Sequence, residues 1–348
     1  MILYTSGTTG VPKGALLSHG AILEVSEHLR RKAEGVPEDV VLNALPMFHI
    51  FGIMFSLFGP LYIGTSTVTL KSFNPELFLQ SLLKFQATAT NIVPTIAFIL
   101  LQVAEKVGKL PEFPSLSRVI CGAATLPVSV HQKFEKIFGV KIFEGYGLTE
   151  ACMAGCLNTT EGERRKWGSV GKPLPGFNEI AILDEKDQPI ASDRIGEIVI
   201  RGNNVMMEYL KDPEATAEAL QNGWLHTGDM GFKDADGYLY IVDRKKDMII
   251  VGGENVYPRE VEDLLAGHPD IAEVAVLGVP NEKYGEEVVA CVGLNKPGLD
   301  EQTLIAFAKQ NLAPFKVPHH VFFFDQLPRN PAGKVLKATL RAKIADLL

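Results

Sequence analysis

The sequence has few cysteines and no strong excess of charge of either sign. Its 348 residues contain four cysteines, Cys121, Cys152, Cys156 and Cys291, which are too few for a disulfide scaffold in so long a chain. No basic segment followed by an apolar one opens the sequence, so this pattern predicts a cytoplasmic, reducing location. The formal charge is −7, from 34 basic and 41 acidic side chains. That balance lacks the basic footprint of a protein whose main partner is nucleic acid.

Long uninterrupted apolar runs are also missing. Residues 40–70 carry no Asp, Glu, Lys or Arg, and such a stretch is long enough to suggest a membrane span. Prolines, glycines and His49 interrupt it, and its tail, residues 65–70, has the β-branched pattern of a strand. We therefore expect a buried helix followed by a buried strand. Peripheral contact with a membrane and assembly into a homo-oligomer both stay open.

The composition that is present, 46% hydrophobic and 22% charged, is that of a globular enzyme and excludes disordered and coiled-coil chains. Helical stretches alternate with short β-branched runs up to residue 140, such as the expected strand at 118–121, which predicts a parallel α/β sheet. Further along the chain, a helix is expected at 258–266. We predict an α/β multidomain protein with an α/β core (1–163), a β-rich subdomain (164–243) and a mobile, small α+β C-terminal domain (244–348). The charged run 243–247 is the expected hinge.

The most informative segment is Tyr4-Thr5-Ser6-Gly7-Thr8-Thr9-Gly10-Val11-Pro12-Lys13-Gly14. Glycines let a loop expose successive backbone N–H groups, hydroxyls add donors and a lysine adds a positive charge, so the segment predicts a cradle for polyphosphate. Its spacing is not that of a Walker loop. The dinucleotide fingerprint is absent too, because Glu150 stands where a glycine is needed after Gly145 and Gly147. A flexible linker would explain the glycines but not Pro12-Lys13-Gly14.

This segment and five others resemble the acyl-adenylate-forming enzymes, a family that includes acyl-CoA synthetases, aryl-CoA ligases, firefly luciferase and peptide-synthetase adenylation domains. All six stand in the order that this family has. They are the phosphate loop (4–14), the acyl-pocket segment (46–52), the adenine and magnesium segment (145–150), the ribose segment (227–229), the hinge (243–247) and the segment of the catalytic lysine (328–334).

The resemblance implies roles for individual residues. The expected ATP and AMP ligands are Thr5, Ser6, Gly7, Thr8, Thr9, Gly10, Lys13, Gly122, Ala123, Ala124, Gly145, Tyr146, Gly147, Thr149, Asp229 and Arg244. Glu150 is a hard oxygen ligand suited to Mg²⁺, and Thr5 is expected to supply a second oxygen. Tyr146, between two glycines, can lie flat on an adenine. Asp229 can accept from both ribose hydroxyls, and Arg244 can donate to the same sugar.

The remaining predicted residues act on the acyl group. Lys334 is the expected catalytic cation that bridges the substrate carboxylate and the α-phosphate. His49 is expected at the mouth of the pantetheine tunnel. The C-terminal domain is expected to rotate near Lys246, and the loop with Gly252, Gly253 and Glu254 would then replace Lys334 for the reaction with CoA.

Together these features predict an ATP-dependent acyl-CoA synthetase that uses ATP, Mg²⁺ and CoA, with a fatty acid as the favoured substrate. The alternatives are an aryl-CoA ligase, an amino-acid adenylation domain or an inactive ligand-binding fragment. The pocket segment contains no acid to hold an α-amine, which argues against an amino acid. In the family a large N-terminal region precedes the phosphate loop, and we expect that this sequence lacks it.

Overall fold

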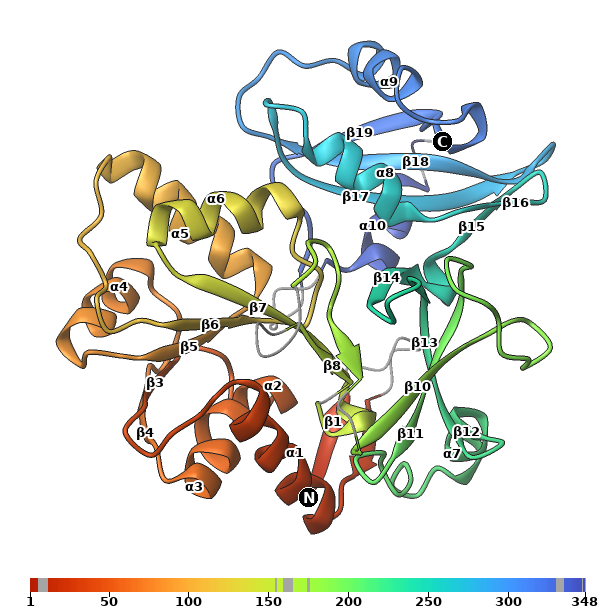
Figure 1. The fold of residues 1–348 in the computed structure, drawn as a ribbon. Coiled ribbons are helices and arrows are strands. Elements are labelled where there is room, and N and C mark those ends of the chain that lie inside the picture. The colour runs from red at the N-terminus through yellow and green to blue at the C-terminus, as the bar shows by residue number, and fades with distance from the viewer. Residues whose placement is uncertain are drawn as a thin grey trace. The chain divides into compact units, whose positions relative to one another are not determined.

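The computed structural model describes residues 1–5, 12–153, 155–158, 165–173, 176–329, 335–345 and 347. These residues form two compact units (Figure 1). The first comprises Met1–Thr227 and Gly231–Ile241, and the second comprises Gly228–Met230 and Val242–Leu348. The predicted division into three domains at 163 and 243 stays a prediction, because the α/β and β-rich parts share one unit.

The first unit contains a seven-stranded sheet in the order β4-β3-β5-β6-β7-β8-β9. Its strands are β3 (Val40–Asn43), β4 (Ser66–Thr69), β5 (Ala89–Ile92), β6 (Arg118–Cys121), β7 (Lys141–Tyr146), β8 (Cys156–Leu157) and β9 (Lys172–Pro173). The pairs from β4 to β7 are parallel, whereas β8 and β9 are antiparallel to their neighbours. The predicted α/β core is confirmed, and two short antiparallel strands extend it. Nine residues, 147–155, separate β7 from β8, which is too few for a crossover connection between parallel strands.

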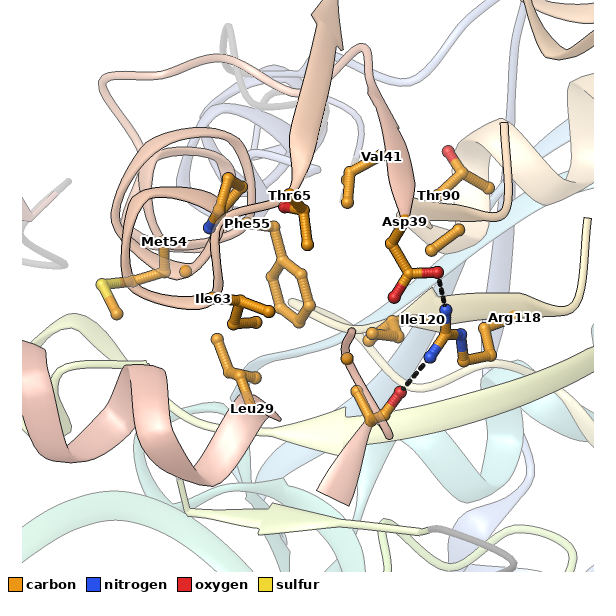
Figure 2. Close-up of a pocket in the computed structure, with 15 residues that line it drawn as sticks. Leu29, Asp39, Val41, Met54, Phe55, Ile63, Thr65, Thr90, Arg118 and Ile120 are labelled. Atoms are coloured by element: carbon orange, nitrogen blue, oxygen red, sulfur yellow. Dashed lines mark hydrogen bonds and ion pairs between the residues drawn. The ribbon is translucent and has the colours of Figure 1, made fainter. Parts of the chain in front are cut away.

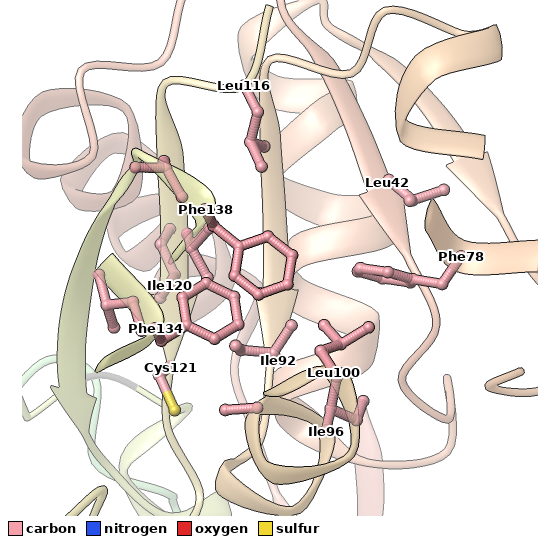
Figure 3. Close-up of a cluster of buried hydrophobic side chains, with 14 of the residues drawn as sticks. Leu42, Phe78, Ile92, Ile96, Leu100, Leu116, Ile120, Cys121, Phe134 and Phe138 are labelled. Carbon is pink, nitrogen blue, oxygen red and sulfur yellow. The ribbon is translucent and has the colours of Figure 1, made fainter. Parts of the chain in front are cut away.

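Helices cover both faces of this sheet (Figure 1). One face carries α4 (Pro75–Lys84), α5 (Pro94–Val107) and α6 (Val128–Phe138). Their buried side chains form one cluster with the strands, in which Phe134 and Phe138 of α6 stack at 4.2 Å between ring centroids (Figure 3). The other face carries α1 (His19–Lys32), whose first turn is capped by the Ser18 hydroxyl.

A continuous helical run spans the uncharged stretch. It consists of α2 (Ile50–Ile53), a π-helical turn (Met54–Phe58) and α3 (Gly59–Ile63). Pro60 has no N–H to donate to the preceding turn, which accounts for the local change of helical pitch. The expected buried strand that follows is β4, but it lies at the sheet edge with Ser66 and Thr69 exposed, so the expectation of burial was wrong there. Within the described ranges, no helix has the length and apolar character needed to cross a bilayer.

A β-rich part follows, which belongs to the first unit except for residues 228–230 and 242–244 of its sheet, which belong to the second. It contains the hairpin β1 (Ile2–Thr5) and β2 (Lys13–Leu16), the helix α7 (Pro213–Ala219) and a five-stranded sheet of β10 (Asn178–Leu183), β11 (Gly196–Gly202), β12 (Leu220–Gln221), β13 (Trp224–Lys233) and β14 (Leu239–Arg244). Buried residues of α1, α2 and this sheet form a single cluster. The hairpin strand β2 is therefore fixed beside the rest of the unit, which matters because β1 and β2 flank the predicted phosphate loop.

The second unit is an α+β domain, as predicted. Its sheet contains β15 (Ile249–Val251), β16 (Glu254–Val256), β17 (Ile271–Asn281), β18 (Gly285–Leu294) and β19 (His320–Phe324). The helices are α8 (Pro258–Ala266), α9 (Glu301–Lys309) and α10 (Lys337–Ile344). Alternate residues of β17 and β18 pack against α8 and α9 on one face and against α10 on the other.

Candidate active site

Three predicted phosphate and metal residues lie in one group in the first unit. Thr5 and Lys13 are cross-strand partners in the β1–β2 hairpin, and the Thr5 hydroxyl donates to the Lys13 carbonyl at 3.4 Å. The Lys13 ammonium lies over the ring of Tyr209, 5.2 Å from its centroid, which is a favourable cation–π distance. The predicted ligands Ser6, Gly7, Thr8, Thr9 and Gly10 lie outside the described residues.

Tyr209 also contacts the predicted magnesium ligand. Its hydroxyl donates to Oε1 of Glu150 at 2.7 Å, and the Glu150 carbonyl accepts from the Met206 backbone at 2.7 Å. Glu150 lies in a short 3₁₀ turn, Thr149–Ala151, shortly after the end of β7. Tyr209 was not among the predicted residues. A bridge between Ala15 and Tyr209 joins β2 to this distant part of the chain, and no local sequence pattern signals such a pairing.

These oxygens fit a magnesium ion that is held mainly by nucleotide. A carboxylate has about four lone-pair sites, so Glu150 can accept from Tyr209 and still offer oxygen to a cation. Mg²⁺ in nucleotide sites is usually bound by one or two carboxylates together with phosphates and water. In the part of the chain that the structure describes, no group of three or more His, Cys, Asp and Glu could hold a metal by itself. One carboxylate and one hydroxyl are the protein ligands expected for a metal ion that binds together with the phosphates of a nucleotide.

The two predicted adenine segments lie at the carboxyl ends of neighbouring parallel strands: Gly122 directly follows β6, and Gly145 and Tyr146 are the last residues of β7. A Cβ on Gly122 would stand 3.2 Å from the Gly145 carbonyl and 3.6 Å from the Phe51 ring, so the backbones approach closely there. Ala123 has φ of +67°, an unfavourable conformation for a residue with a side chain. Gly155 of the returning chain lets the backbone pass the Tyr146 ring, since its Cβ would lie only 3.0 Å away. These approaches bring Gly122 and Gly145 together beside a partly buried Tyr146.

A buried ionic network contacts the residues next to these segments. Glu144, which precedes Gly145, accepts from the Leu126 backbone at 3.2 Å and lies 3.3 Å from Nδ1 of His131. The other ring nitrogen of His131 is 3.2 Å from Glu135, and Arg165 donates to the same carboxylate at 2.9 Å. Burial alone would lower the pKa of His131, but the two carboxylates outweigh it and raise this pKa above its ordinary value. The network joins the loop after β6 to the end of β7.

This network predicts a pH dependence of stability. Because the folded-state pKa of His131 is raised, its stabilising contribution is complete below the unfolded value of about 6.5 and is lost as pH rises through the folded value. We expect the free energy of unfolding to fall over that window in the wild type and to fall less steeply in His131→Gln. Urea unfolding followed by tryptophan fluorescence measures this in the first unit, which holds both Trp167 and Trp224.

The matched control for this experiment is His19→Gln, at an exposed position. It should retain the wild-type pH slope. An identical slope in His131→Gln and the wild type would contradict the assignment of the pH dependence to this network.

His49 caps the helical run that starts at Ile50. Its Nδ1 accepts from the Phe51 backbone at 3.2 Å, and burial lowers its pKa, so the ring is neutral with a proton on Nε2. His49 is half-buried rather than part of the apolar core. The capping bond fixes the ring and leaves Nε2–H as the donor for another group. The role of His49 at a tunnel mouth stays a prediction.

A largely apolar cavity lies between this helical run, α1 and the sheet (Figure 2). The space within it that no atom occupies, open solvent included, is about 490 Å³. Eleven of its fifteen lining residues are apolar or glycine, among them Leu29, Val41, Phe55 and Ile120. The Asp39 and Arg118 side chains that line it form an ion pair with each other.

The predicted ribose, hinge and CoA residues belong mainly to the second unit. Asp229 is buried in β13 and accepts from Nε of Arg244 at 2.7 Å, so the two predicted ribose ligands bind each other. Lys246 lies in a 3₁₀ turn, Lys245–Asp247. Lys334 lies outside the described residues.

The loop predicted to face CoA is a tight hairpin turn. Gly252 and Gly253 join β15 to β16, and both have positive φ, +60° and +91°. Two such residues in succession make the hairpin turn that favours glycine at both positions. Glu254 is the first residue of β16 and is exposed. The backbone conformation of this turn therefore favours glycine at both positions, in addition to the room that the glycines could leave for a ligand.

Comparisons with known proteins cover most of the chain. The family model described as AMP-binding enzyme matches residues 1–210, and the one described as AMP-binding enzyme C-terminal domain matches residues 260–334. A long-chain-fatty-acid–CoA ligase of Bacillus subtilis is 40% identical over 98% of this chain and 61% of that protein. A sulfoacetate–CoA ligase of Cupriavidus necator is 37% identical over 98% of this chain and 66% of that protein.

The fold comparison agrees. The crystal structure of ATP-bound MatB from Rhodopseudomonas palustris matches with a TM-score of 0.92 and 36% identity, over 99% of this chain and 68% of that one. The predicted fold, an α/β core with a β-rich part and a small α+β domain of the acyl-CoA synthetase kind, is confirmed. The chain spans less than two thirds of the length of the two curated relatives, 61% and 66%.

Proposed function

The chain belongs to the AMP-binding enzyme family, as its motifs predicted, and on that premise we propose that it is an AMP-forming acid–CoA ligase whose acid carries an apolar, fatty acyl chain. The proposed reaction has two steps. An oxygen of the substrate carboxylate attacks the α-phosphorus of ATP, and pyrophosphate leaves. The sulfur of CoA then attacks the carbonyl carbon of the acyl-adenylate, loses its proton, and AMP leaves.

The described residues support the nucleotide half of this proposal. Tyr146 would lie against the adenine beside Gly122 and Gly145, and the Asp229–Arg244 pair would contact the ribose hydroxyls. Lys13 would contribute positive charge near the phosphates, where its ammonium is already fixed over Tyr209. Glu150 and Thr5 would hold Mg²⁺, which screens phosphate charge when it is bound.

Lys334 would lie between the carboxylate and the α-phosphate, because two like charges must otherwise approach to bonding distance. His49, held by its capping bond, would offer Nε2–H at the acyl side. The change from the first step to the second is proposed to occur by rotation about Lys246, which would present Gly252, Gly253 and Glu254 in place of Lys334.

The observation that carries the substrate class is the apolar cavity. It lies beneath the helical run that begins directly after His49, and it is lined by Met54, Phe55 and Ile63 of that run. Alkyl groups gain free energy when they leave water for such a lining, whereas an α-amine or a sulfonate would lose hydration without a free counter-charge. The charged pair at the cavity neutralises itself. A fatty acid therefore fits better than an amino acid or a small sulfonated acid.

Pyrophosphate exchange into ATP tests the proposal directly. We expect exchange with straight-chain fatty acids to exceed exchange with benzoate, sulfoacetate and amino acids, and CoA to convert the adenylate to a thioester. Exchange that is fastest with an aryl or amino acid would overturn the substrate class. ATP binding without exchange for any acid would indicate an inactive ligand-binding protein.

A further inference from the structure

The helical run and the strands that line the apolar cavity lead from the end of the sheet with the predicted nucleotide segments to its opposite end. Strands β3, β5 and β6 are parallel, and Gly122 follows the carboxyl end of β6. The helical run Ile50–Ile63 starts at that end, where a Cβ on Gly122 would lie 3.6 Å from the Phe51 ring. It finishes at the other end, where Ile63 lies 3.0 Å from a Cβ placed on Gly35, in the segment that leads into β3. Four strand residues separate the two ends, about 13 Å.

An ion pair stands at the end that is remote from the nucleotide segments. Asp39 directly precedes β3, and Arg118 is the first residue of β6. Their side chains are only 6% and 12% exposed, and a terminal nitrogen of Arg118 binds Oδ1 of Asp39 (Figure 2). Both charges therefore lie at the amino ends of the strands that form one wall of the cavity.

Several further bonds fix this pair in place. The second terminal nitrogen of Arg118 donates to the carbonyls of Ala33, at 2.8 Å, and of Glu34, at the end of α1. Asp39 accepts from the Thr88 hydroxyl at 2.6 Å and from the Val36 backbone at 2.9 Å. The pair thus joins the end of α1 to the starts of β3, β5 and β6. A ligand that displaced it would leave several buried polar groups without partners, which is costly.

We propose that the Asp39–Arg118 ion pair closes the acyl cavity and sets the longest acyl chain that this protein accepts. The inference rests on the proposed function, since it requires an acyl chain in this cavity. Each methylene that enters apolar space strengthens binding by about fourfold. A methyl end that reaches the pair gains nothing more. It would cover Nε of Arg118, a buried donor that has no partner among the described residues.

The experiment compares kcat/KM for pyrophosphate exchange over saturated acids from butanoate to octadecanoate. For the wild type we expect a rise of about fourfold per methylene up to one chain length and no rise beyond it. The variant replaces both charges, Asp39→Leu with Arg118→Met, because one charge left alone in the cavity wall would be strongly destabilising. We expect the break, which is the chain length at which kcat/KM stops rising, to move to longer acids. The rise per methylene below the break should stay unchanged.

A second variant keeps the test valid if the double replacement does not fold. Ala89 lines the cavity beside Arg118, its partner across β5 and β6, so Ala89→Leu fills the closed end and should move the break to shorter acids. Ala181→Leu is the matched control, on a partly exposed strand position away from the cavity, and should keep the wild-type break.

The outcomes separate this inference from the proposed function. A break that stays at one length in the folded variants would overturn the chain-length limit alone. An ω-hydroxylated acid that is preferred more than about tenfold over the plain acid at the limiting length would also overturn it, because the pair would then recognise a polar end. No exchange with any acid of the series would overturn the proposed function and the limit with it.

Discussion

Lys334→Ala should slow pyrophosphate exchange at least about a hundredfold, which is the loss expected when a charge contact made in the transition state is removed. The physical reason is that the attacking carboxylate and the α-phosphate are both negative, and a positioned ammonium lowers the cost of their approach. Thioester formation from supplied acyl-adenylate should survive, because in that step the phosphate leaves as AMP. The measurement is the rate of each half-reaction, assayed separately.

The control for this variant is Lys343→Ala, an exposed lysine of the following helix α10. It removes the same charge nine residues further along the chain and should leave both half-reactions unchanged. An equal loss of both half-reactions in Lys334→Ala would contradict a role for Lys334 in adenylation alone. Retention of full exchange would remove Lys334 from the proposed catalytic group.

Elements with clear boundaries could be predicted from the sequence. The helix α8 (Pro258–Ala266) begins at a proline and ends before a glycine, and the predicted range 258–266 coincides with it. The strand β6 (Arg118–Cys121) also matches its predicted range. The long strand β13 was not predicted, because Gly228 within it looks like part of a turn and has φ of +67°. Pro and Gly therefore predicted a boundary correctly where they flank a helix, and they misled where a glycine lies inside a strand.

The candidate site was predictable to the extent that its residues lie in contiguous motifs. Glu150, Tyr146 and Lys13 were predicted in this way. Tyr209, which contacts both Glu150 and Lys13, comes next to them only through the pairing of distant segments. The Asp39–Arg118 pair likewise depends on the parallel order of β3, β5 and β6. Such contacts follow from topology, and no motif of a few residues encodes them.

Glu150→Gln should sharply raise the Mg²⁺ concentration needed for ATP binding and cut turnover, because a neutral amide is a much weaker ligand for a hard divalent cation than a carboxylate. Tyr209→Phe should weaken Mg²⁺ affinity by a smaller factor, about tenfold, because it removes the hydroxyl that orients the Glu150 carboxylate. It keeps the ring under Lys13, so the cation–π contact survives. Calorimetric titration of ATP over a range of Mg²⁺ concentrations measures both effects without relying on activity.

A comparison of ATP affinity with and without Mg²⁺ distinguishes a metal ligand from a structural carboxylate. ATP affinity in the presence of a chelator should be similar in the wild type and in both variants, because adenine contacts at Tyr146 do not involve Glu150. Glu208→Gln, beside Tyr209 but exposed, is the matched control and should retain the wild-type Mg²⁺ dependence. If Glu150→Gln weakened ATP binding equally with and without Mg²⁺, its carboxylate would stabilise the fold of the site rather than hold the metal. An unchanged Mg²⁺ dependence would place the ligand elsewhere, and Tyr209 would then lose its assigned role as well.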